Sequence, residues 1–152
     1  MRLVRRVREE SGSIAPAVPV IAAVLLLLGG LGIDGSRQLN ARGEAVAFAE
    51  EAARAGAEAV DVDSDELKLD EPMVRQRVDA YCARVEDLGQ VTSCRFVRID
   101  PVSGSDPRRL VVVTEVHLQI EASLLGMVGV HKLSASASAR ARPYEGIDAP
   151  TE

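Results

Sequence analysis

The stretch GSIAPAVPVIAAVLLLLGGLGI, residues 12–33, contains no charged side chain and decides the architecture of this chain. As an α-helix rising about 1.5 Å per residue, a run of this length extends about 33 Å, enough for a hydrocarbon core about 30 Å thick. We therefore predict a transmembrane helix over residues 13–33, and the lipid bilayer is the first predicted partner.

The charges on either side of the predicted span indicate its orientation. Four arginines lie within residues 1–12, whereas Arg37 and Arg42 alone lie close to the other end. Because arginine next to a span holds that end in the cytoplasm, we expect a cytoplasmic basic leader at residues 1–12 and residues 34–152 outside. A cleaved secretory signal is the alternative, although its apolar region is typically about 7–15 residues long. Both interpretations export the remainder of the chain.

The exported part has room for one small domain and little capacity to bind nucleic acid. Residues 34–152 contain 14 Lys and Arg against 21 Asp and Glu, a net charge of −7, whereas nucleic-acid binding requires clustered cations. The chain also lacks a stacking platform for bases or sugars. Its four aromatic residues are Phe48, Tyr81, Phe96 and Tyr144.

Cys82 and Cys94 are the two cysteines of the chain, and both lie in the part predicted to be exported. In an oxidising compartment an even pair is most simply interpreted as a disulfide. We expect this bridge to contribute about 3 kcal/mol by the chain-entropy estimate.

Residues 34–60 contain no proline and are rich in Ala, Glu and Arg, so we predict that the anchor continues outward as one long helix. Small residues recur along one face at three- and four-residue steps, which favours close lateral packing against other helices. Gly29 and Gly30 would allow the same approach inside the span. The predicted helix-packing residues are Gly29, Gly30, Ala45, Ala49, Ala52, Ala53 and Gly56.

Residues 61–143 are predicted to form a small extracytoplasmic α+β domain, followed by a loose tail at residues 144–152. An apolar stripe from Val74 to Leu88 indicates a second helix that Gly89 terminates. Alternating patterns indicate strands around residues 94–99, 110–122 and 130–142, the last two forming an antiparallel pair. The fold class is therefore α+β, with a transmembrane helix, a long helix, a second helix and a small antiparallel sheet.

No pattern in the chain indicates catalysis, a metal site or a cofactor, and we expect neither enzymatic activity nor a small-molecule substrate. The acidic residues 61–71 lack the central glycine of a calcium loop and are interpreted as a solvated linker. His117 and His131 could face each other on paired strands, but their surroundings lack further ligands at metal spacing. No serine lies in a nucleophile elbow, although an unrecognised hydrolase remains a third alternative.

Residues 8–60 resemble the TadE/TadG-like proteins of tight-adherence (Flp) pilus assembly. The resemblance rests on a Gly-Ser start, an anchor that ends in Asp-Gly, a Leu-Asn-x-Arg step and an alanine-rich helix that ends in Ala-Gly-Ala. The closing Ala-Arg-Ala-Arg strand is similar to the ending of the family. The motif residues are Gly12, Ser13, Asp34, Gly35, Asn40 and Arg42.

The resemblance implies a non-enzymatic accessory or minor pilin-like protein of a type IV-related pilus or secretion apparatus, with a pilin-like head and with other machine proteins as partners. Ala17 stands where members cut by a prepilin peptidase carry glutamate, so the chain is more similar to an uncleaved TadG-like anchor. The alternative from a different class is an anchored binding module whose acidic segment captures a cation or a basic partner.

Overall fold

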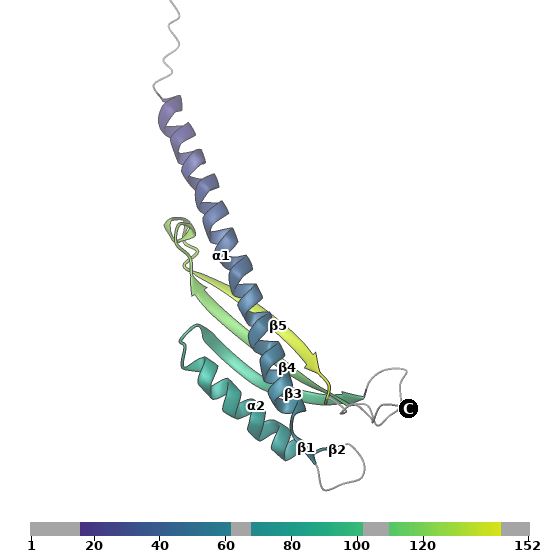
Figure 1. Cartoon of the computed structure of the whole chain (residues 1–152). Helices are drawn as coiled ribbons and strands as arrows, with labels where there is room; N and C mark the ends of the chain where they lie inside the picture. Colours follow the sequence, from purple (N-terminus) through teal and green to yellow (C-terminus); the bar gives the residue numbers. More distant parts are fainter. Residues whose placement is uncertain (1–15, 62–67, 102–109, 144–152) are drawn as a thin grey trace, which may run out of the picture.

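A computed structural model describes residues 16–61, 68–101 and 110–143 of the chain. It has the predicted α+β architecture, in which one long helix, a second helix and a three-stranded antiparallel sheet build a single domain (Figure 1). The principal elements are α1 (Ala17–Ala57), α2 (Glu71–Glu86), β3 (Val91–Pro101), β4 (Leu110–Glu121) and β5 (Lys132–Ala141).

Helix α1 is continuous over 41 residues and extends roughly 60 Å at the usual rise per residue. It passes through Gly35 and Gly43 without a break, as expected for a segment dominated by good helix formers. Its first half projects beyond the domain, whereas its second half lies across the sheet (Figure 1). The predicted long helix is thus confirmed, and it ends at Ala57.

The sheet has the order β3-β4-β5, and each neighbouring pair is antiparallel, as predicted for the last two strands. Strand β4 is central, and its inward side chains are buried at alternating positions: Val112, Thr114, Val116 and Leu118. Strand β5 contributes only small buried side chains, Ala135 and Ala139. These small residues allow a helix to approach the sheet closely.

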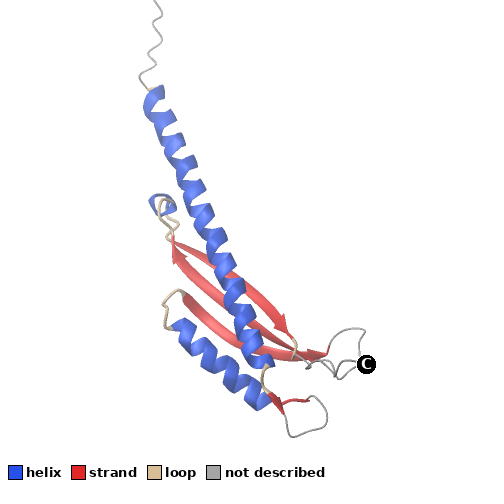
Figure 2. Cartoon of the chain, viewed as in Figure 1, coloured by secondary structure: helices blue, strands red, loops and turns tan. Residues whose placement is uncertain are grey.

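The core lies between this sheet and the two helices. Helix α1 packs mainly on β4 and β5, while α2 packs on α1 and β3 (Figure 2). Gly56 of α1 is the crossing point, because a Cβ there would lie 2.8 Å from Val78 of α2 and 2.9 Å from Val112 of β4. The domain therefore has two layers, one of helices and one of sheet.

Helix α2 follows its predicted apolar stripe except at the end. Val74, Val78, Cys82 and Val85 are buried, but Leu88 lies beyond the last helical residue and is exposed. The helix stops at Glu86, and Gly89 takes a φ of 78°, which a residue with a side chain rarely adopts. Assigning Leu88 to the buried stripe was wrong because the chain leaves the helix before reaching it.

A disulfide joins Cys82 of α2 to Cys94 of β3, with 5.2 Å between the Cα atoms. The Cys94 N–H donates to the Glu86 carboxylate at 2.9 Å, so α2 and β3 are tied together twice within one turn of the helix.

Two features were not predicted from the sequence. Short strands β1 (Val60–Asp61) and β2 (Lys68–Leu69) pair with each other, β1 at the start of the acidic residues 61–71 and β2 near their end. Residues 123–129, which lie between the last two predicted strands, contain the 3-10 helix η1 (Leu125–Val128). The predictions for the leader, most of the acidic segment and the tail fall outside the described residues.

Candidate functional site

The first half of α1 presents an apolar surface that the domain does not cover. A window of 18 residues within this helix has a mean hydropathy of 2.2, and 11% of it is buried. A core helix of a soluble domain would be mostly buried, so this segment fits a bilayer better than a protein interior. The exposed large apolar residues are Val18, Val20, Ile21, Val24, Leu25, Leu26, Leu27, Leu28, Leu31 and Ile33.

Asp34, the first charged residue after the apolar run, is fully buried. Its carboxylate accepts three backbone hydrogen bonds, from the N–H groups of Ser123 at 2.8 Å, Leu124 at 2.9 Å and Leu125 at 2.6 Å. These hydrogen bonds, that from Leu125 first, hold the pKa of Asp34 below its ordinary value, and Arg37 acts in the same direction. Asp34 therefore clamps the β4–β5 loop, residues 122–131, onto α1 where the apolar half ends.

The same loop contacts the apolar half itself. Gly30 is buried because Leu124 lies over it, and a Cβ at Gly30 would approach the Leu124 side chain to 2.8 Å. The prediction that Gly30 serves the approach of another transmembrane helix is thus wrong, since this chain's own loop occupies the position. Gly29 has nothing within 4 Å of the corresponding point and stays available.

The small-residue stripe of α1 is inside the domain. Ala45, Ala49, Ala52, Ala53 and Gly56 are all buried, and they pack against the sheet and α2 of the same chain. The Thr114 hydroxyl of β4 donates to the Ala49 carbonyl at 2.7 Å, which fixes the helix to the sheet. The expectation that this stripe packs against other proteins is corrected: its small side chains serve the chain's own core.

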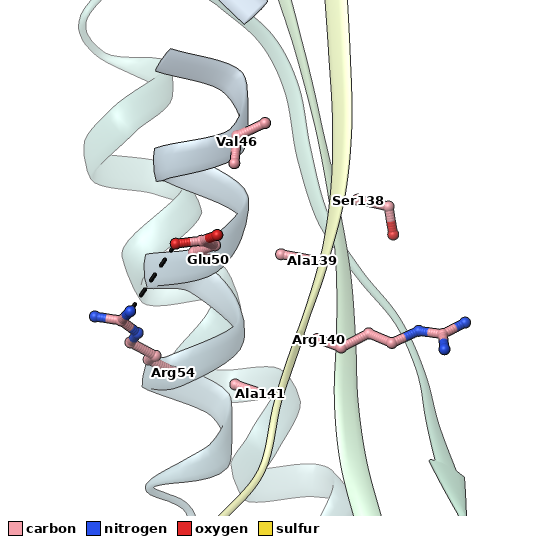
Figure 3. A pocket seen from close by; sticks show the side chains of 7 residues that line it. All are labelled: Val46, Glu50, Arg54, Ser138, Ala139, Arg140 and Ala141. Atoms are coloured by element: carbon pink, nitrogen blue, oxygen red, sulfur yellow. Dashed lines mark ion pairs between the residues drawn. The ribbon is translucent and has the colours of Figure 1, made fainter. Parts of the chain in front are cut away.

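An open hollow of roughly 400 Å³ lies between α1 and the edge strand β5. Ala139 and Ala141 point toward the helix, whereas Ser138 and Arg140 point to the opposite side of the strand (Figure 3). On the helix side, Arg54 and Glu50 form an exposed ion pair at 3.9 Å. This arrangement offers neither an activated nucleophile nor a converging set of polar groups.

The two histidines are not brought together. His117 pairs with Ser136 across the sheet, and His131 belongs to the β4–β5 loop. Glu115 is bound by Arg95 at 2.6 Å and lies 3.2 Å from His117. The hydrogen bond from Arg95 lowers the pKa of Glu115, so this carboxylate is held ionised on the sheet surface. Within residues 16–61, 68–101 and 110–143, no group of three or more metal-binding side chains occurs.

The structure describes four of the six predicted motif residues, and one of the four is buried. Asp34 has a structural role, while Gly35 has open space around it and Asn40 and Arg42 are exposed. Gly12 and Ser13 lie outside the described residues. The loop clamp was missed from the sequence, although a signal exists: Gly30, Asp34, Ala41 and Ala45 share one helical stripe, so Asp34 lies on the buried face.

Comparison with known families finds a match near the start of the chain. Residues 12–59 match the model described as putative Flp pilus-assembly TadE/G-like, which confirms the resemblance drawn from the motifs. The match covers the apolar half of α1 and its buried stripe, and it ends just after the helix. No curated protein and no solved structure matches the chain.

Proposed function

We propose that this chain, which carries a TadE/G-like segment at residues 12–59, is a minor pilin-like or accessory component of a Tad/Flp pilus or a related secretion apparatus. In this proposal it acts as a membrane-anchored structural protein, without catalysis. The observation that carries the proposal is the coincidence of that match with a helix whose first half is apolar and exposed and whose second half forms the core of a domain.

The proposed topology places the leader in the cytoplasm and the domain outside. The arginines in the leader support this orientation through the positive-inside rule. The Cys82–Cys94 disulfide supports it independently, because such bonds persist in oxidising compartments and are rare in the cytosol.

The proposed assembly contacts are on the part of α1 that the domain leaves free. The stripe from Ala45 to Gly56 is occupied, so partners would approach the exposed span, where Gly29 and Gly32 have open space. In a bilayer, small residues of this kind allow two helices to pack closely. The partners proposed are other membrane proteins of the pilus or secretion machine.

Deletion of the gene in the native cell tests the proposal. We expect fewer surface fibres, or less of the exported cargo, with recovery on complementation by the full chain. A chain lacking residues 1–33 serves as the matched control, and we expect it not to complement because it lacks the anchor. Normal fibres and normal export in the deletion strain would contradict the proposal.

A further inference from the structure

The β4–β5 loop carries an apolar tip that is exposed among the residues that the structure describes. Met127 is 68% exposed, Val128 55% and Val130 43%, and Leu124 and Leu125 are partly exposed. Single exposed apolar residues are common on protein surfaces. Several exposed apolar residues next to one another on one loop indicate an interaction surface.

The position of the loop identifies the partner. Leu124 lies on Gly30, which is about one helical turn inside the apolar run that ends before Asp34. Figure 2 shows η1 beside the long helix, at the end of the sheet from which the apolar half projects. The apolar surface of the loop is therefore continuous with that of the helix, and a bilayer around one would also meet the other.

Many backbone N–H groups of the loop are already hydrogen-bonded within the protein. This matters in a bilayer, where backbone polar groups without partners are costly. Asp34 accepts the N–H groups of Ser123, Leu124 and Leu125. Within the loop, the N–H of Met127 donates to the Leu124 carbonyl, that of Gly129 to Gly126 and that of Val130 to Leu125. The Ala122 N–H donates to the His131 carbonyl and closes the base of the loop.

The charges around the loop fit a membrane surface. Arg37 donates to the Ser123 hydroxyl, and Lys132 lies two residues after the apolar tip. Cationic side chains in such positions can reach the headgroups while their neighbours contact the acyl chains. The nearby carboxylates are Asp34, which the loop itself covers, and Glu121 at the end of β4.

We propose that the β4–β5 loop inserts its apolar tip, Leu124–Val130, into the interface of the bilayer that holds α1, forming a second membrane contact. Burial of such a tip reaches about 5–10 Å into the headgroup and acyl boundary. The domain would then be held against the membrane at two points and could not rotate freely about α1. This inference rests on the proposed membrane anchoring.

The chain contains no tryptophan, so one introduced indole reports on one position. We would place Met127→Trp in the loop, Met73→Trp at the start of α2 as the matched control and Leu28→Trp in the span as the reference for anchoring. Each full chain would be inserted, one copy per disc, into nanodiscs of phosphatidylcholine and phosphatidylglycerol with or without brominated acyl chains.

We expect bromine to quench Trp at positions 127 and 28 several-fold more strongly than at position 73, with blue-shifted emission for the first two. Quenching at position 28 but not at 127 would overturn the loop insertion and leave the anchor in place. Quenching at neither would overturn the anchoring on which the inference rests. Burial of position 127 only when several copies share a disc would instead assign the tip to contact with a second copy.

Discussion

At the scale of single residues, Asp34 has the most consequential position in the chain. A carboxylate that follows an apolar run directly is usually interpreted as the water-facing end of a span. Here the carboxylate is buried and accepts hydrogen bonds from three backbone N–H groups of a loop that is distant in the sequence. The sequence indicates the boundary at Asp34, but the loop that it binds lies about ninety residues away and cannot be identified from local pattern.

The lowered pKa of Asp34 predicts a dependence on pH. Because the folded pKa lies below the unfolded value of 3.8, the ionised clamp stabilises the fold above that value, and the contribution is lost as the pH falls toward the folded pKa. We expect Asp34→Asn to be less stable at neutral pH and to lose less stability on acidification. Urea unfolding of the full chain in detergent at several pH values measures this.

The pKa of Glu115 is also lowered in the folded protein, by its hydrogen bond from Arg95. Its ionised form therefore stabilises the fold as well, and part of the loss of stability in acid should remain in the Asp34→Asn variant. An unchanged acid dependence in the variant would contradict the assigned role of Asp34.

Thr114 provides a second test at this scale. Its buried hydroxyl donates to the Ala49 carbonyl, and replacing it with valine keeps the shape but removes the hydrogen bond. We expect Thr114→Val to lower the free energy of unfolding by about 1 kcal/mol. The matched control is Thr92→Val, whose exposed hydroxyl donates to the His117 carbonyl at 3.2 Å and should matter less. Equal effects of the two substitutions would contradict the account.

At the scale of elements, the existence and order of α1, α2 and the three strands of the sheet could be predicted because their periods are clear. The alternation along β4, the stripe of α2 and the unbroken helix-forming stretch after residue 33 all identify their elements correctly. Periodicity cannot show which other element packs against a given face of a helix. A stripe of alanine is suitable for another transmembrane helix or for a flat sheet of small residues, and Ala135 and Ala139 show that the sheet occupies it.

The occupied stripe predicts a fold defect from bulky substitutions. Ala49→Leu inserts a large side chain into a closed interface, and we expect a loss of about 1–3 kcal/mol in the free energy of unfolding. The control is Ala47→Leu, at an exposed position on the same helix, which should leave stability nearly unchanged. If Ala49→Leu has wild-type stability and disrupts only assembly, the small residues of α1 pack against other proteins, and their assignment to the chain's own core is contradicted.

At the scale of the whole molecule, the chain is a domain built around the second half of its longest helix, α1. The helix is apolar and, apart from Gly30, exposed over residues 17–33, and it becomes the central support of the α+β fold over residues 41–57. The domain therefore cannot be separated from α1 without exposing its core. The disulfide adds a covalent link between the second helix and the sheet edge.

The Cys82→Ser, Cys94→Ser double variant tests that link. Removing the crosslink relaxes the unfolded chain, and we expect a loss of about 3 kcal/mol, with the fold retained at low temperature. Denaturant titration of the oxidised and reduced wild type beside the variant gives the measurement. Equal stabilities in all three would show that the bond does not constrain the fold.

The central claim is that lipid surrounds the apolar half of α1. Alkaline carbonate extraction of membranes from cells that make the full-length chain tests it most directly. The account predicts that the protein stays in the membrane pellet and leaves it only with detergent. Recovery of the intact chain in the wash or in the cytosol would contradict the anchor and every proposal that depends on it.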